Sequence, residues 1–94
     1  LRAATTDEIH TALFVQLVSG HAQMALTLLG ELPHPDTGSL APPDAAGGKM
    51  FIDQLEMLEA RTRGNLNAEE IRVLQQALRV TRRALAAVLD RQSE

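Results

Sequence analysis

The feature that most restricts the fold of this chain is the segment Ala12–Leu32, which is its most apolar stretch but carries polar residues at helical spacing. At about 100° per residue its apolar side chains form one broad face, and the opposite side collects Gln16, Ser19, Gln23 and Thr27. A capping-box sequence, Thr5–Glu8, precedes the segment, and Gly30 followed by Pro33 closes it. The pattern predicts one helix over about 6–30, roughly 37 Å long.

The polar residues also bear on membrane insertion. A helix that spans a bilayer needs about 20 predominantly apolar residues. This segment is interrupted by Gln16, Ser19, His21 and Gln23. We therefore expect no membrane-spanning helix, and no part of the chain has the pattern of a signal peptide.

Two shorter helices are expected after a proline-rich loop over residues 31–44. Asp44 is a suitable N-cap for a helix over about 45–63, and Gly64 ends that helix. A complete start signal follows, because Asn67 is an N-cap residue with Glu70 three positions later. The third helix is expected over about 68–91, and its expected inner face comprises Ile71, Leu74, Leu78, Leu85, Val88 and Leu89.

The composition favours helices over sheets. Hydrophobic residues make up 45% of the chain and aromatic residues only 2%. The core must therefore be built from aliphatic side chains, which suit helix packing. We expect a single all-α domain over residues 1–94, made of one long helix and an antiparallel helix pair.

The predicted helices carry more apolar surface than one small core can cover. Each has an apolar arc of about 200°, whereas roughly 100° suffices to face one core. A chain of this size buries only about 60–65% of its unfolded surface, so we expect oligomerisation to complete the bundle, with a homodimer as the simplest form. The expected interface is a stripe on the first helix with heptad spacing. It consists of His10, Phe14, Leu17, His21, Met24 and Leu28.

The residue types limit the chemistry that the chain can support. Cysteine, tyrosine and tryptophan are absent, and the usual signatures of metal, nucleotide and acyl chemistry are missing. His10 and His21 lie roughly 16 Å apart on one helix, too far to share a metal ion unless a second copy contributes. The favoured interpretation of His21 is a hydrogen bond to a polar neighbour such as Gln54. We expect no catalytic residue, no metal, no cofactor and no enzymatic activity.

The proline-rich loop holds a second group of polar candidates. His34 and Asp36 have the residue types of a general base and its orienting carboxylate, but no nucleophile or metal ligand set accompanies them. The loop is longer than a simple connection between helices requires. We therefore expect any partner-binding loop to use His34, Asp36 and Thr37.

Four arginines are expected along the outer face of the third helix: Arg72, Arg79, Arg82 and Arg83. They form either an anion-binding stripe or surface ion pairs with Asp53, Glu56 and Glu59 of the second helix or of a second copy. The chain has 9 Lys+Arg against 12 Asp+Glu and a net charge of -3. This balance disfavours nucleic acid as a partner.

Two separated motifs now carry a resemblance. The first is Leu28–Gly38, which contains the turn Pro33–Gly38, and the second is Phe51–Glu70. Together they are similar to the small bacterial domain-of-unknown-function family 1844, over about Leu13–Leu85. The resemblance implies a short, mostly helical, soluble bacterial protein, and it implies no activity or catalytic residue. The chain departs from the family pattern at Ala41–Asp44 with Gly47 and Gly48, and its last helix lacks the aromatic residue often found near the end.

Two functional hypotheses follow from the sequence. The first is a non-enzymatic, self-associating interaction or assembly module of the cytoplasm, without membrane attachment. The second is a nucleic-acid-associated helper that uses the arginines of the third helix. A salt-dependent shift of labelled DNA or RNA distinguishes them.

Overall fold

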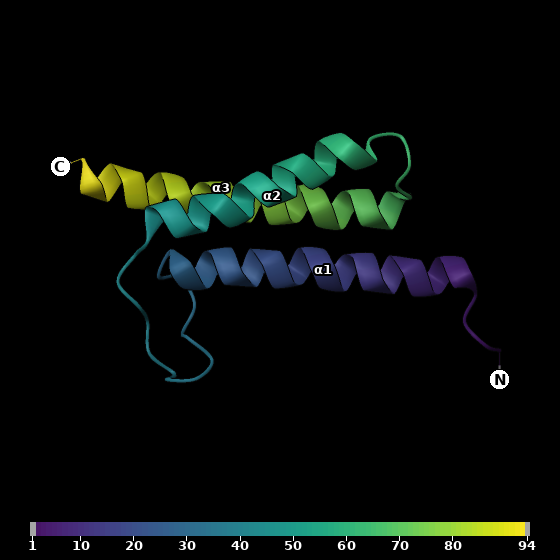
Figure 1. Cartoon of the computed structure of the whole chain (residues 1–94), viewed down its shortest axis with the longest axis horizontal. Coiled ribbons are helices and arrows are strands. Elements are labelled where there is room, and N and C mark those ends of the chain that lie inside the picture. Colours follow the sequence, from purple (N-terminus) through teal and green to yellow (C-terminus); the bar gives the residue numbers. More distant parts are fainter. Residues whose placement is uncertain (1, 94) are drawn as a thin grey trace.

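The computed structural model describes residues 2–93, which form three helices and, within that range, no strand (Figure 1). The helices are α1, Thr6–Leu28; α2, Ala45–Thr62; and α3, Ala68–Gln92. The all-α prediction with three helices is therefore confirmed. The helices end at residues 28, 62 and 92, each within about two residues of the end expected from the sequence.

The three helices form an elongated bundle. The α1 helix runs antiparallel to α2 and roughly parallel to α3, and each helix packs against both others (Figure 1). The Cα positions extend over 53 × 30 × 15 Å, with a radius of gyration of 15.2 Å. A compact chain of this length has a radius of about 12 Å, so the single chain is more extended than a round bundle.

Local hydrogen bonds explain where α1 begins and ends. Thr5 Oγ1 accepts from the Glu8 amide at 3.1 Å, and the Glu8 carboxylate accepts from the Thr5 amide at 2.9 Å. At the other end Gly30 has φ 79°, and its amide donates to the Thr27 carbonyl at 3.1 Å. A positive φ at this position is easily reached only by glycine, which ends the helix.

The proline-rich loop leaves α1 and returns to nearly the same place. Gly30, two residues past the end of α1, lies so close to Ala41 and Pro43 that a Cβ at Gly30 would be 3.1 Å from the Ala41 carbonyl oxygen. At the far end the Asp44 amide donates to the Leu28 carbonyl at 2.7 Å. Asp44 also caps α2 by accepting from the Gly47 amide at 2.9 Å. The loop is thus an excursion closed at its base.

The turn between α2 and α3 uses the stop and start signals found in the sequence. Gly64 has φ 85°, directly after the last residues of α2. Asn67 and Glu70 form a reciprocal capping box, in which the Glu70 amide donates to Asn67 Oδ1 at 2.8 Å and the Asn67 amide donates to Glu70 Oε1 at 2.9 Å. The two helices of the predicted antiparallel pair are joined here.

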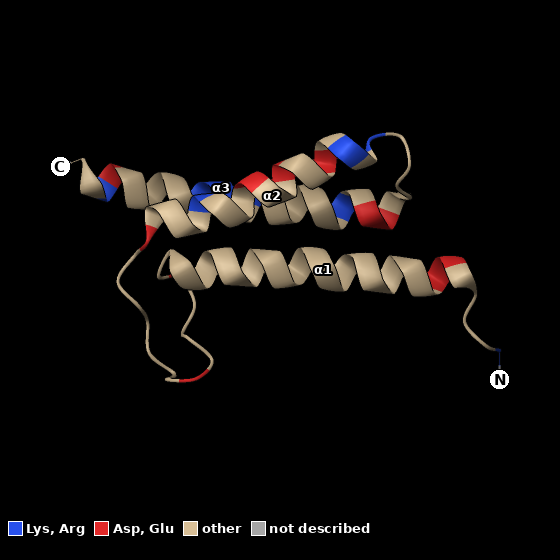
Figure 2. Cartoon of the chain, in the orientation of Figure 1, with Lys and Arg blue, Asp and Glu red and all other residues tan. Residues whose placement is uncertain are grey.

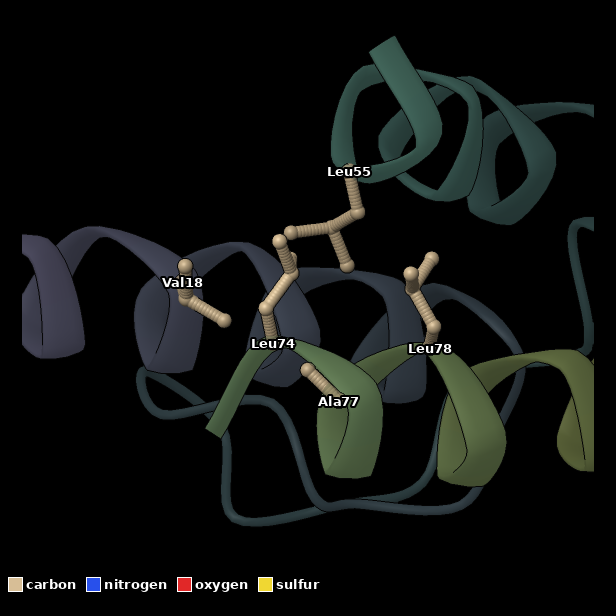
Figure 3. Close-up of a cluster of buried hydrophobic side chains, with 5 residues drawn as sticks. All are labelled: Val18, Leu55, Leu74, Ala77 and Leu78. Atoms are coloured by element: carbon tan, nitrogen blue, oxygen red, sulfur yellow. The ribbon is translucent and has the colours of Figure 1, made fainter. Parts of the chain in front are cut away.

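The core consists of two clusters of small and aliphatic side chains, to which all three helices contribute. In the first cluster, side chains from the three helices point toward a common centre (Figure 3): Val18, Leu55, Leu74, Ala77 and Leu78. The second cluster lies nearer the C-terminus of α3: Ala25, Leu29, Ile52, Ala84 and Val88. The two clusters follow one another along the molecule, as expected for an elongated bundle.

The buried face of α3 differs from the expected one. Ile71 and Leu89 were expected inside, but both are about half exposed, whereas Thr81 is fully buried. The reason is rotation about the helix axis, because Glu70 and Val88, which precede Ile71 and Leu89 in the sequence, are buried at the same two ends of α3. Ile71 and Leu89 each lie about 80° around the helix from Thr81, on the flank of the buried face, so they stay half exposed.

Candidate interaction surface

The α1 helix carries a row of large apolar side chains that the rest of the chain does not cover. Ile9, Leu13, Leu17 and Met24 are between 48% and 56% exposed. Their spacing of three to four residues, or multiples of it, places them on one side of the helix together with Gly20. We call these five residues the α1 face.

No formal charge interrupts the α1 face. The sequence contains no Asp, Glu, Lys or Arg between Glu8 and Glu31. Figure 2 shows the consequence: α1 is uncharged along almost its whole length, whereas α2 and α3 carry charges of both signs. An exposed apolar row of this length without charges is unusual for a surface helix and is typical of a contact surface.

The apolar surface continues from α1 onto the neighbouring edge of α2. Met50 and Met57 are each 52% exposed. Leu17 and Met57 line the same apolar hollow of about 110 Å³, which lies between the two helices. Methionine adapts its shape readily, so it suits a contact surface that must fit another protein.

The residues of the predicted oligomer stripe have different environments within one chain. His10 is exposed, Leu17 and Met24 are about half exposed, and Leu28 is partly covered. Phe14 packs against the first core cluster. The stripe therefore lies along the border between the contact of α1 with α2 and its outer surface, and as an interface it stays a prediction.

His21 has its polar atoms paired within the chain. Its Nε2 lies 2.9 Å from Gln54 Oε1 and its Nδ1 lies 3.1 Å from the Leu17 carbonyl oxygen. The ring also meets Phe51 edge-on, with centroids 5.6 Å apart. The hydrogen bond to Gln54 confirms the interpretation of His21 as a structural histidine that joins α1 to α2.

Gly20 is the one member of the α1 face without a side chain. Among the described residues nothing lies within 4 Å of the position that a Cβ would take. Gly48 is the opposite case, because a Cβ there would lie 2.6 Å from Leu29. Close packing between α1 and α2 thus explains why residue 48 has no side chain. No contact within the described part of the chain explains why residue 20 has none. Sequence reasoning did not single out Gly20, and its position in the apolar row was the available signal.

The four arginines expected along the outer face of α3 do not form one stripe. Arg82 points to α2 and donates to Glu56 at 2.7 and 3.1 Å, as the ion-pair interpretation expects. Arg79 donates to Gln76 on its own helix. Within residues 2–93, Arg72, Arg79 and Arg83 have no carboxylate within 4.0 Å. Three arginines, rather than four, therefore face outward.

The predicted partner-binding loop is exposed and held by its own hydrogen bonds. The Gly38 amide donates to the His34 carbonyl at 2.8 Å, and the Ser39 amide donates to Thr37 Oγ1 at 3.2 Å. The Asp36 amide donates to His34 Nδ1 at 3.2 Å, while the Asp36 carboxylate is 4.0 Å from that nitrogen. Since Nδ1 accepts from the backbone, it does not donate to the carboxylate as a base-orienter pair requires.

A second polar cluster joins α1 to the start of α3. Thr11 Oγ1 donates to Glu70 Oε2 at 3.1 Å and accepts from Asn67 Nδ2 at 2.8 Å. The carboxylate of Glu70 is thereby bound on both oxygens, although the residue is buried. The sequence indicated the Asn67–Glu70 pair, but it held no sign that Thr11 completes it.

The largest charge effect lies at the start of α1. Glu8 accepts from the Arg2 guanidinium at 2.8 and 3.0 Å and from the backbone amide of Thr5. These donors, with Arg2 first, lower the pKa of the Glu8 carboxyl from 4.5 to about 2. Both side chains of the pair are exposed, so it holds the N-terminal segment against the capping box rather than forming a reactive site.

The hollow at the turn between α2 and α3 has a volume of about 360 Å³. Of its polar side chains, Glu59 accepts from Gln75 and Thr62 donates to the Leu58 carbonyl, while Arg63 makes no hydrogen bond within residues 2–93. Among residues 2–93 there is no group of three or more His, Asp or Glu side chains that could hold a metal ion. In that same range no helix is long and apolar enough to cross a membrane.

Comparison with known protein families gives one match. The model of the Domain of unknown function (DUF1844) family matches residues 11–86, which is most of the chain. The chain belongs to the DUF1844 family. The match covers the α1 face from Leu13 onward, the proline-rich loop, α2 and most of α3. Searches of curated proteins and of solved structures found no match to this DUF1844 protein.

Proposed function

We propose that this DUF1844 protein is a non-enzymatic interaction module that associates with itself through the α1 face. The observation that carries the proposal is the uncharged row of half-exposed apolar side chains on α1, continued by Met50 and Met57 on α2. Monomeric proteins rarely leave an apolar surface of this kind in water.

The surface area of the single chain supports the proposal. Its accessible surface is 6455 Å². A compact monomer of 10.2 kDa exposes about 5,300 Å², so this chain exposes about 1,100 Å² more. A standard protein interface buries about 800 Å² on each partner. The extra surface, to which the proline-rich loop also contributes, is large enough for a dimer interface.

Light scattering coupled to size exclusion tests the proposal, with refractive index as the concentration signal because the chain has no Trp or Tyr. We expect a dimer at micromolar concentration. The variant Leu17→Glu should be monomeric, because it places a charge in the middle of the α1 face. Leu89→Glu is the matched control, since Leu17 and Leu89 are both 49% exposed but Leu89 lies on α3. A monomeric wild-type protein would refute the proposal.

A second candidate function uses the outward arginines of α3. Arg72, Arg79 and Arg83 have no carboxylate within 4.0 Å in the described chain, so they are free to bind an anionic backbone. The net charge of -3 opposes this function. The double variant Arg79→Glu/Arg83→Glu should abolish any salt-dependent shift of labelled RNA or DNA, while Arg61→Glu/Arg63→Glu should retain it. The absence of a shift at low salt would remove this candidate.

The remaining expectations from the sequence stay predictions. They are a cytoplasmic location and a partner-binding role for the loop at His34, Asp36 and Thr37. The loop keeps its shape through its own hydrogen bonds, which suits a preformed binding surface.

A further inference from the structure

We infer that two copies of the chain pair through α1 in antiparallel orientation, with Leu13 of each copy lying over Gly20 of the other. The inference rests on the proposed function and adds the symmetry and register of the contact. The two-fold axis passes near the midpoint between Gln16 and Leu17.

The first argument is the symmetry of the α1 face itself. Leu13 and Gly20 are equally distant from the midpoint between Gln16 and Leu17, and so are Ile9 and Met24. Reversing the helix about this point therefore places Ile9 opposite Met24 and Leu13 opposite Gly20. An isologous dimer requires such a self-complementary surface.

The second argument is the fit of side chains. Nothing in the described part of the chain lies within 4 Å of a Cβ at Gly20, so the site is open to a second copy. Glycine inside a helix is less stable than alanine, and a close approach by another chain is a physical reason for its presence. Leu13 is 56% exposed, the highest value on the α1 face, and it is the side chain that the antiparallel register places over this gap.

The parallel arrangement fits less well. It would set Leu13 against Leu13 and Gly20 against Gly20, so that the Gly20 layer leaves a void two turns away from a layer of two large side chains. Packing that leaves a void or forces large groups together is unfavourable. The antiparallel register avoids the void by placing Leu13 over Gly20.

The third argument is the position of Met57. Leu17 and Met57 line the same hollow of about 110 Å³ between α1 and α2, so both lie near the proposed axis. The axis brings Leu17 and Met57 of the two copies together, and the hollow then receives an apolar side chain of the second copy. The contact thereby extends from α1, about 34 Å long, onto the edge of α2.

Disulfide cross-linking tests the register cleanly because the chain contains no cysteine. The double variants Leu13→Cys/Gly20→Cys and Ile9→Cys/Met24→Cys should give covalent dimers under mild oxidation. The four single variants should not give covalent dimers, because in the antiparallel register the same position of the two copies lies far apart. Residues 13 and 20 of one helix are roughly 10 Å apart, so a disulfide within one chain is excluded.

A size exchange provides an independent test. Gly20→Leu should raise the dimer dissociation constant about tenfold or more, because two leucines then collide at each contact. In the antiparallel register, adding Leu13→Ala should restore most of the lost dimer affinity. In a parallel dimer Leu13 never meets residue 20, so Leu13→Ala would recover nothing.

The outcomes separate the two proposals. A monomeric wild-type protein refutes self-association and this inference together. If the single variant Leu13→Cys cross-links, the dimer is parallel. That result overturns the proposed register, while self-association holds. A dimer that forms no cross-link through any of these α1 positions also overturns the register, because the contact then lies elsewhere.

Discussion

The hydroxyl of Thr11 donates to the carboxylate of Glu70 at 3.1 Å, although 59 residues separate the two in the sequence. This bond attaches α1 to the capping box of α3, because Asn67 also donates to the Thr11 hydroxyl at 2.8 Å. A local helix-start signal has thus become part of the contact between two helices. Thr11 is the residue on which this contact depends.

Replacing Thr11 by valine should destabilise the protein by about 1–3 kcal/mol. The substitution keeps the shape of the side chain but leaves Glu70 Oε2 and Asn67 Nδ2 without their protein partner. Chemical denaturation measures the effect. Thr27→Val is the matched control, because the Thr27 hydroxyl donates only to the Gln23 carbonyl of its own helix. Equal effects of the two substitutions would contradict the role given to Thr11.

Replacing each of two glycines by alanine should change the stability of the protein in opposite directions. Gly48→Ala should cost about 1–2 kcal/mol, because its Cβ would lie 2.6 Å from Leu29 and the core would have to shift. Gly20→Ala should stabilise the single chain by about 0.5–1 kcal/mol, since its Cβ meets open space and alanine favours the helix. Both stability changes can be measured by thermal unfolding at a protein concentration low enough to favour the monomer. A stabilising Gly48→Ala would show that α1 and α2 are less closely packed than described.

Thr81 should be replaceable by valine without loss. Thr81 is fully buried, and its hydroxyl donates only into its own helix, to the carbonyls of Ala77 and Leu78. Those carbonyls retain their backbone hydrogen bonds when the hydroxyl is removed, so no buried group is left without a partner. We expect Thr81→Val to lower the free energy of unfolding by less than about 0.5 kcal/mol. Thr81→Ala, which leaves a cavity, should be clearly destabilising.

The Glu8 carboxyl should titrate near pH 2 in the folded protein. Its pKa is lowered to about 2 from 4.5, so its contribution to stability is complete above the unfolded value of 4.5 and disappears as the pH falls toward 2. NMR titration of the Glu8 side chain measures this pKa. Arg2→Ala should raise it, because Arg2 is the largest cause of the shift. Lys49→Ala, which removes the partner of Asp53 instead, should leave it unchanged.

Replacing both Pro33 and Pro35 by alanine should leave the helix content near that of the wild type. The loop is closed at its base by the Asp44–Leu28 hydrogen bond and by Gly30, and neither contact involves these prolines. Circular dichroism measures the helix content. A loss of helical signal would show that the proline-rich loop holds the fold together, and would count against a partner-binding role.

The sequence alone determined where the helices begin and end. Thr5, Gly30, Asp44, Gly64 and Asn67 were identified as caps or stops, and each acts as expected. These signals can be read from the sequence because the hydrogen bonds and backbone angles involved reach only a few residues along the chain. For His21 the sequence suggested Gln54 only as one possible polar neighbour. The packing of α1 on α2 brings the two side chains into contact.

Only the tertiary structure decided which part of each apolar arc is buried. Ile71 and Leu89 lie outside while Thr81 lies inside, and the α1 face is left uncovered. Arg82 turns to Glu56, whereas Arg79 and Arg83 face away from α2. The physical reason is that each arc is wider than one neighbouring helix can cover, so the crossing of the helices selects the buried side chains. Helical periodicity gives the arc, but it contains no information about where the neighbour lies.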